Sequence, residues 1–485
     1  MPNNKNGAGP TLVWFRRDLR IDDNAALAAA VERGEPILPV YIWAPEEEGN
    51  WPLGAAARWW THHALQSLGD ALKAQQMTLV VRQGVSLECL RALVEETGAE
   101  AVYWNRRYEP AIRERDGGIK KALTDDGLDA RSFNSHLLYE PHTVENKSGK
   151  PFQVFTPFWK EASSTEYPAP ITVDLGGLGS PKPYPDSKDI SDLDLLPKEN
   201  WGQGLAEFWD PSLQGAEDRL QAFLKEAVMD YGDARNRPDI DGSSRLSPYL
   251  AHGQLGPRQV VARTLEVGDE RAKGIKKFIA EIGWREFSYH LLYHFPDTPD
   301  EPLRAEFAHF PWDDDKDLLK AWRKGRTGYP LVDAGMRQLW QVGWMHNRTR
   351  MNVASLLVKH LLLPWQEGTR WFWDCLVDAD LANNTQGWQW AGGCGADAAP
   401  YFRIFNPMMQ GDRYDPQGDY IRQYVPELAE LPKSVIHQPW EASESQLGAA
   451  GVELGKDYPR PIIDHKAGRE RALEAFEKLK ERRSA

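Results

Sequence analysis

The amino-acid sequence predicts an α/β plus all-α protein, with an N-terminal doubly wound parallel sheet, a long linker and a C-terminal all-helical domain. Three observations support this prediction. Short β-branched and aromatic runs alternate with Ala- and Leu-rich segments over residues 11–135, as in sheets covered by helices on both faces. Residues 140–214 are rich in Pro, Gly, Ser and Asp, which is typical of a surface connection. Beyond residue 215 the apolar residues follow a helical pattern, without convincing alternation at period two. We therefore expect domains over residues 10–139 and 215–475.

The first domain is expected to be Rossmann-like, and in such sheets ligands sit beyond the carboxyl ends of the strands. The segment Phe15–Asn24 follows the first strand and lacks the Gly-x-Gly-x-x-Gly pattern of a dinucleotide site, so we do not expect NAD there. The predicted strands are Thr11–Phe15, Ile37–Trp43, Thr78–Arg82, Ala101–Trp104 and Ala130–Phe133.

The linker is predicted to cross the surface between the two domains. Within it, Phe152–Trp159 is rich in aromatic residues, and we expect it to be tethered to the rest of the protein. Gly176–Ser180 is predicted to be a flexible turn. It is not expected to bind phosphate, because no Lys-Ser or Lys-Thr pair follows, as a phosphate-binding loop requires.

In the helical domain, a helix over 275–295 places four polar or aromatic residues on one face: Glu281, Trp284, Arg285 and Ser288. A buried carboxylate is costly without a partner, so this face suggests a binding site. The alternative is a Glu281–Arg285 ion pair at the surface. The last stretch, Asp464–Arg483, is predicted to form a solvated amphipathic helix.

Composition limits the possible functions. The net charge of −13 excludes nucleic-acid binding by total charge, so any DNA site must be a local basic patch. Twenty Trp are a large excess, and indole is the most readily oxidised aromatic side chain, so redox chemistry is one explanation. Three widely spaced Cys indicate neither a disulfide framework nor a zinc site. The N-terminus lacks an apolar signal core. We expect a cytoplasmic monomer with no metal and no membrane span.

The stretch Asn384–Pro407 has the most unusual composition. Trp388 and Trp390 flank a Gln, and three Gly follow within residues 392–395. Glycine lets the backbone approach a ligand closely, so this cluster beside large aromatic rings suggests a planar ligand. The alternative is a Gly-rich turn packed by surface Trp residues.

This stretch resembles the signature of the photolyase/cryptochrome flavoproteins, and further matching motifs extend from Leu12 to Pro426. The chain is most similar to class III photolyases, which repair cyclobutane pyrimidine dimers. The resemblance implies FAD in the helical domain, with the reduced anion as the active form. It also implies UV-damaged DNA as the partner, and a photoexcited reduced flavin that donates an electron to a flipped-out lesion.

The resemblance assigns residues to FAD. The segment around Ser243–Ser247 would grip the diphosphate, although by itself it could be a plain helix cap. Asn384 would face the flavin, and Arg350 would stabilise the anion. The full set of implied FAD contacts is Tyr231, Ser243, Ser244, Leu246, Ser247, Arg285, Asn347, Arg350, Asp378, Asp380 and Asn384.

A second set of residues would bind the lesion and its DNA. Photolyases that act on the six-four photoproduct carry His at the positions of Asn347 and Met351, so this chain follows the dimer-repair pattern. Met351 alone could be core filler. The set comprises Glu281, Trp284, Asn347, Arg348, Met351, Trp390 and Arg403. Glu281 and Asn384 are also assigned to catalysis.

Two further features follow from the resemblance. Trp388, Trp365 and Trp312 match a relay that carries electrons to oxidised flavin, although they could simply pack helices. Glu109 matches an acidic ligand of a methenyltetrahydrofolate antenna, but the His that related proteins carry within residues 44–54 is missing, and Glu109 could be a surface residue without a ligand.

Two other functions remain open. A cryptochrome-type blue-light sensor would bind flavin without repairing DNA. A nucleotide-binding α/β enzyme would explain residues 11–135 but not the Trp motifs.

Overall fold

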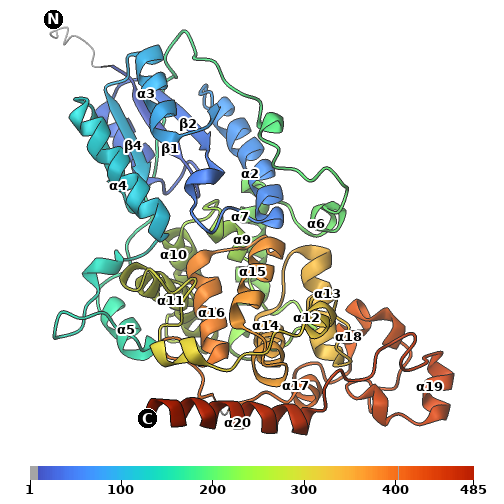
Figure 1. Cartoon of the computed structure of the whole chain (residues 1–485). Helices are drawn as coiled ribbons and strands as arrows, with labels where there is room; N and C mark the ends of the chain where they lie inside the picture. The colour runs from blue at the N-terminus through green and yellow to red at the C-terminus, as the bar shows by residue number, and fades with distance from the viewer. Residues whose placement is uncertain (1–8, 402, 485) are drawn as a thin grey trace, which may run out of the picture.

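The computed structural model describes residues 9–401 and 403–484, so Phe402 of the Gly- and Trp-rich stretch lies outside the description. It confirms the predicted fold class. A parallel sheet forms the upper half of the molecule in Figure 1, and helices form the lower half.

The sheet has five strands in the order β3-β2-β1-β4-β5, all parallel. Thr11 of β1 lies opposite Ile37 of β2 on one side and Ala101 of β4 on the other. The strands are β1 (Thr11–Phe15), β2 (Ile37–Trp43), β3 (Val80–Gln83), β4 (Ala101–Asn105) and β5 (Asp129–Phe133), and the helices around them are α1 (Ala25–Arg33), α2 (Ala55–Ala74), α3 (Ser86–Thr97) and α4 (Pro110–Asp125). The third strand begins two residues later than predicted.

The chain order reverses between β1 and β4, where doubly wound sheets usually bind ligands. Here the chain's own polar side chains meet. Arg16 forms a buried ion pair with Asp116 at 2.6 Å, and the Asn105 Nδ2 donates to Asp18 at 2.6 Å. The Phe15–Asn24 segment therefore supplies internal hydrogen bonds at this point.

The linker contains short helices, namely α5 (Phe155–Ala162) and α6 (Gln203–Phe208), with the 3₁₀ turns η2 (Pro141–Thr143) and η3 (Ile190–Leu193). It returns along the sheet edge: the Ser187 hydroxyl accepts from the Val81 N–H at 2.9 Å, and the Lys188 N–H donates to the Val81 carbonyl at 3.0 Å. The linker thus covers the exposed edge of β3, which otherwise presents unpaired backbone groups.

The helical half is built around α11 (Lys273–His294), which packs against α16 (Leu381–Gly392), and α20 (His465–Ser484) runs along the lower side of this half in Figure 1. Its helices are α7 (Leu213–Glu226), α8 (Tyr231–Ala234), α9 (Ser247–Ala251), α10 (Pro257–Val267), α11 (Lys273–His294), α12 (Lys316–Arg323), α13 (Pro330–Val342), α14 (Asn347–Ser355), the π-helix η5 (Leu356–His360), α15 (Trp365–Cys375), α16 (Leu381–Gly392), α17 (Pro407–Tyr414), α18 (Asp419–Tyr424), α19 (Glu444–Ala450) and α20 (His465–Ser484).

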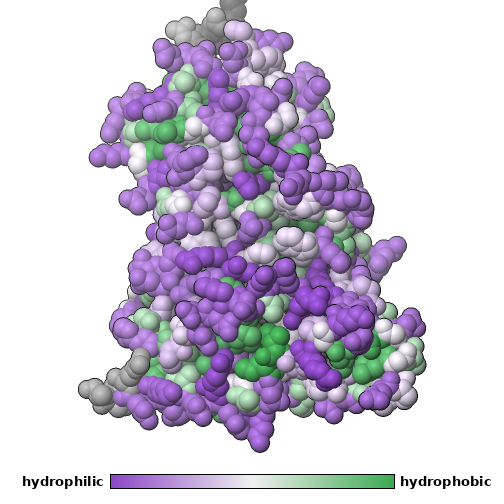
Figure 2. Space-filling model, turned by 45° about the vertical axis from the view of Figure 1, so that its right-hand side comes forward, coloured by the Kyte–Doolittle hydropathy of each residue, from purple (hydrophilic) through white to green (hydrophobic). Residues whose placement is uncertain are grey.

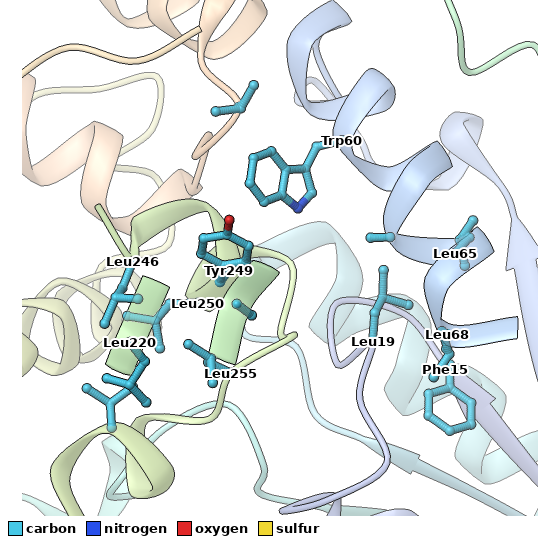
Figure 3. Packing of buried hydrophobic residues seen from close by; sticks show 14 of the residues in the cluster. Phe15, Leu19, Trp60, Leu65, Leu68, Leu220, Leu246, Tyr249, Leu250 and Leu255 are labelled. Atoms are coloured by element: carbon cyan, nitrogen blue, oxygen red, sulfur yellow. The ribbon is translucent and has the colours of Figure 1, made fainter. Parts of the chain in front are cut away.

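One hydrophobic cluster joins the two halves. It runs from Phe15 of the sheet through α2 to α7 and α9. Figure 3 shows Trp60 of α2 facing Tyr249 of α9; their ring centres are 5.0 Å apart, and the Trp60 indole N–H donates to Gln254 at 2.7 Å. The halves therefore hold a defined relative position. Figure 2 shows a largely hydrophilic face, with hydrophobic patches over the helical half.

Candidate functional site in the helical half

A cavity of about 660 Å³ lies within the helical half. This volume is within the range of ligand-binding pockets. Asn347 and Gly387 line it and are exposed, so it opens to the surface. Most residues predicted from the sequence meet here: Tyr231, Ser243, Ser244, Leu246, Ser247, Glu281, Trp284, Arg285, Asn347, Arg348, Arg350, Met351, Asp378, Asp380, Asn384, Trp388 and Trp390.

The charge of the cavity differs from that of the whole chain. Its lining contains six cationic side chains and three acidic ones, although the protein carries a net charge of −13. The cations are Arg235, Arg245, Lys277, Arg285, Arg348 and Arg350, and the acids are Glu281, Asp378 and Asp380. This excess of positive charge fits an anionic ligand.

A loop before α9 provides an anion-binding surface. Arg219 holds it from behind, because the guanidinium donates to the carbonyls of Ser243 and Ser244 at 2.8 Å each. Arg245 adopts a left-handed φ of 52°. The N–H groups of Ser243, Ser244 and Arg245 have no acceptor in the described part of the chain. Free amides near a helix start are a common phosphate site, so the loop fits a diphosphate.

A second polar group surrounds the ion pair of Arg350 and Asp378. The Arg350 Nη2 lies 2.8 Å from the Asp378 Oδ2, and the Arg350 Nε donates to the Met345 carbonyl at 2.7 Å. The other oxygen, Asp378 Oδ1, is buried and has no partner among the described residues. A buried acceptor without a donor is costly, so this atom fits a ligand N–H group.

The N-cap residue of α16, Asp380, and Asn384 within the helix complete this side. Asp380 caps the helix by accepting from the Asn383 N–H at 2.8 Å, and it also accepts from the Tyr289 hydroxyl. The Asn384 Nδ2 donates to the Thr369 carbonyl at 3.0 Å. This bond fixes the Asn384 amide and leaves its carbonyl oxygen for a ligand.

Glu281 lies in the cavity wall and pairs with two cations. It contacts Arg235, the residue just after α8, and lies 3.3 Å from Lys277. The alternative prediction of an ion pair between Glu281 and Arg285 is wrong, because the Arg285 guanidinium donates to the His136 carbonyl at 2.8 Å. Sequence reasoning missed Arg235, although its position four residues after Tyr231 places both side chains on one helical face.

Trp284 and Arg348 are held by aromatic neighbours. The Trp284 ring stacks on Phe155 of α5, with centres 3.9 Å apart and planes at 9°. The Arg348 guanidinium lies over the Tyr414 ring at 4.3 Å and donates to Asn236. Arg403, predicted to contact DNA phosphates, is exposed and does not line the cavity.

The three Trp residues of the predicted relay belong to one hydrophobic cluster. Trp388 lines the cavity, and Trp365 is fully buried behind it in α15. Trp312 is half-buried and lies 4.3 Å from Phe310, and the next N–H, that of Asp313, donates to the Leu362 carbonyl at 2.8 Å. The cluster thus extends from the cavity to a partly exposed indole.

Glu109 does not line this cavity. It is buried and pairs with Arg107 at 2.8 Å, which in turn pairs with Glu48 at 2.7 Å. Burial raises the pKa of Glu109, but the charges of Arg107 and Arg17 outweigh it and hold the pKa far below its usual range. Its charge is therefore already neutralised by the protein.

A second cavity of about 580 Å³ opens where the sheet, the linker and α15 meet. Its lining combines three indoles, two amides, two Arg residues and three carboxylates. The residues are Trp43, Pro45, Glu46, Asn50, Trp51, Pro52, Leu53, Gly54, Arg58, Gln83, Leu193, Asp194, Arg370, Trp373 and Asp374.

No group of three or more His, Cys, Asp or Glu side chains in the described ranges is placed to bind a metal ion. In the same ranges, no helix has the length and apolar character needed to span a membrane.

Comparison with known proteins identifies the family. Residues 11–174 match the model of DNA photolyase, and residues 278–478 match that of the FAD binding domain of DNA photolyase. The chain is 48% identical over 473 residues to a deoxyribodipyrimidine photo-lyase of Agrobacterium fabrum, covering 97% of this chain and 98% of that protein. It is 41% identical to cryptochrome-2 of Arabidopsis thaliana, covering 97% of this chain and 79% of the relative.

Two solved structures support the same family. A bacterial class III photolyase from Agrobacterium tumefaciens superposes with a TM-score of 0.95 at 46% identity, covering 99% of both chains. A cryptochrome from Synechocystis superposes with a TM-score of 0.88 at 30% identity, covering 97% of this chain and 100% of the other. The chain therefore belongs to the photolyase/cryptochrome family.

Proposed function

We propose that this protein is a deoxyribodipyrimidine photo-lyase, a carbon–carbon lyase that uses FAD and light to split cyclobutane pyrimidine dimers in DNA. The observation that carries the proposal is that one cavity combines an anion-binding loop, a buried carboxylate oxygen without a donor, and a wall containing Glu281, Trp284 and Trp390. The similarity to the Agrobacterium photo-lyase extends over nearly the whole chain.

FAD, when bound, supplies light absorption and one-electron donation. The free amides of Ser243 and Ser244 would hold its diphosphate, with Tyr231, Leu246 and Ser247 beside them. Arg350 would place a positive charge near the flavin, and the unpaired Asp378 oxygen would accept a hydrogen bond from it. Arg285, Asn347, Asp380 and Asn384 complete the proposed contacts.

The lesion must leave the duplex to enter the cavity, and photolyases are among the enzymes for which base flipping is generally described. Trp284 and Trp390 provide flat apolar surfaces for the extruded bases, and Glu281 provides a charged acceptor for their N–H groups. Asn347 and Met351 would also contact the lesion, while Arg348 and Arg403 would contact phosphates outside it.

Trp388, Trp365 and Trp312 are proposed to carry electrons between the surface and the cavity. Their membership of one apolar cluster supports this role, because the cluster excludes water along the route.

We propose that an antenna of the methenyltetrahydrofolate type binds in the second cavity. Trp51 and Trp373 offer ring surfaces there, and Arg58 and Arg370 offer charges for carboxylates. Glu109, which the resemblance assigns to the antenna, pairs with Arg107 and does not line this cavity, so its assignment stays a prediction. Arg58→Ala with Arg370→Ala is expected to remove the folate absorption band from the purified protein and leave the flavin bands unchanged.

Repair of a defined oligonucleotide tests the proposal. The purified, reduced protein is mixed with DNA that carries one thymine dimer and illuminated with blue light. We expect light-dependent loss of the thymine dimer from the DNA. In a separate measurement by size-exclusion chromatography, the protein is expected to elute as a monomer. If the protein is yellow but leaves the thymine dimers intact, the alternative function, a cryptochrome-type light sensor, is supported. The 41% identity to cryptochrome-2 is the observation that favours this alternative.

A further inference from the structure

The linker contributes a side chain to the back of the lesion site. Phe155, the first residue of α5, stacks face to face on Trp284 at 3.9 Å and 9°. Phe287 of α11 meets the Trp284 ring edge at 5.9 Å and 74°. The indole thus has aromatic support from two sides, while the same residue lines the cavity.

The row of rings continues away from the cavity. Phe155 is nearly parallel to Trp159, with planes at 8° and centres 6.4 Å apart, and Trp159 faces Tyr167 at 6.4 Å. Trp159 lies tightly on α11, because a Cβ added to Gly283 would come within 2.6 Å of its indole. A glycine directly before Trp284 therefore lets α5 approach this closely.

Hydrogen bonds tie the linker to the loop after α16. The Phe155 N–H donates to the Asp397 carboxylate at 3.2 Å, and the Asp397 N–H donates back to the Gln153 carbonyl at 3.0 Å. The neighbouring Ala396 carbonyl accepts from Gln386, a cavity-lining residue, at 3.3 Å. Phe155 is thus fixed relative to both α11 and α16.

We propose that Phe155 is a positioning residue for lesion binding: it holds the Trp284 indole in the orientation that receives the extruded dimer. The inference rests on the proposed function. Without the Phe155 ring, the Trp284 indole can turn into the space that Phe155 leaves. Binding of the lesion must then restore the orientation of the indole, which lowers the affinity for damaged DNA.

The test measures the affinity of the FAD-loaded protein for an oligonucleotide with one thymine dimer and for the same undamaged sequence. Phe155→Ala is expected to weaken binding of the damaged DNA by roughly three- to tenfold, the value of one stacked aromatic pair. Binding of undamaged DNA is expected to stay unchanged. Phe155→Tyr keeps the ring and is expected to restore affinity.

Phe152→Ala is the matched control. Phe152 is also a half-buried aromatic residue of the linker, but it packs on Phe158 and His290 at 6.3 and 6.4 Å. Its removal is expected to leave damaged-DNA affinity unchanged. FAD content and Tm, measured for every variant, show whether the fold persists, and Phe155→Leu replaces Phe155→Ala if the latter does not fold.

A double-mutant cycle separates positioning from general structural support. In a Trp284→Ala background, Phe155→Ala is expected to cause no further loss of affinity. A further loss equal to that in the wild type overturns the inference, as does unchanged affinity in Phe155→Ala. If the wild type does not distinguish damaged from undamaged DNA, the proposed function fails instead.

Discussion

Gly368→Ala is expected to impair photoreduction of the flavin by displacing Trp388. Gly368 lies in α15 directly against the Trp388 indole, and an added Cβ would be 2.1 Å from its Cη2 atom. Carbon atoms in favourable contact are about 3.5–4.0 Å apart, so the ring must move by roughly 1.5 Å. Phe372 at 5.0 Å and Trp322 at 6.1 Å surround the same indole, so there is little room for this movement.

The size of the effect follows from the packing. Overpacking a core typically costs ~1–3 kcal/mol, which lowers Tm by a few degrees in a protein of this size. The fold is expected to persist, but the Trp388 indole is displaced from its native position in the cavity lining. Photoreduction therefore slows, whereas repair by chemically reduced enzyme is retained because that reaction does not need the relay.

The assay follows the oxidised flavin absorption under blue light with an external thiol as electron donor. Trp388→Phe serves as the reference for a blocked relay. Gly69→Ala in α2 is the control, because an added Cβ there meets no atom within 4 Å. Photoreduction at the wild-type rate in Gly368→Ala, together with the expected fall in Tm, would refute the packing argument; the wild-type rate in Trp388→Phe would refute the relay.

Three further predictions concern charged groups. Glu281→Ala is expected to retain FAD but to lose dimer affinity by roughly tenfold or more, the value of a charge-assisted hydrogen bond, and to leave Arg235 without its carboxylate partner; full repair of the dimer substrate would show that the wall assignment is wrong. Arg350→Ala leaves the buried Asp378 unpaired, which typically costs ~3–5 kcal/mol, so the variant is expected to purify with less FAD and a lower Tm, and an unchanged flavin-to-protein ratio would contradict this. Lys359 is buried, with its ammonium group 3.4 Å from the centre of the Tyr401 ring, and burial lowers its pKa to about 7. Because the unfolded chain binds this proton up to a higher pH, wild-type stability is expected to rise between about pH 7 and 10. Lys359→Met removes the cost of burying the charge, so it is expected to be more stable than wild type at pH 6 by a few kcal/mol, with the difference shrinking toward pH 10; urea midpoints that differ equally at both pH values would exclude this explanation.

Local patterns predicted the fold and much of the cavity. Alternating short apolar runs gave the five strands within a few residues, and helical spacing placed Glu281, Trp284 and Ser288 on one face, which does line the cavity. These predictions depend only on the period of a single element. The meeting of this face with Asn384 came instead from the family resemblance, because no local pattern relates residues about a hundred positions apart.

Long-range pairing could not be predicted. Glu281 pairs with Lys277 one turn earlier in α11, which helical spacing can predict, but it also contacts Arg235, the residue just after α8, and nothing in the spacing of Glu281 and Arg235 requires that contact. Glu109 shows the same limit at short range. Arg107 lies two residues before it, but only the turn between β4 and α4 determines that the two side chains meet and that the carboxylate is neutralised internally.

The linker contributes more to the site than its amino-acid composition predicts. Its Pro and Gly content predicted a surface connection, and surface connections commonly carry functional residues because a rigid scaffold positions them. Four large aromatic residues fall within eight positions of an otherwise polar stretch, namely Phe152, Phe155, Phe158 and Trp159. Exposing so many aromatic side chains to water would be unfavourable, so their presence indicates that the segment packs against the protein. The structure packs them on α11, and the Phe155 N–H donates to Asp397 in the loop after α16. An aromatic run inside a polar linker therefore indicates packing against a neighbouring element, and here one member of the run, Phe155, lies directly behind Trp284.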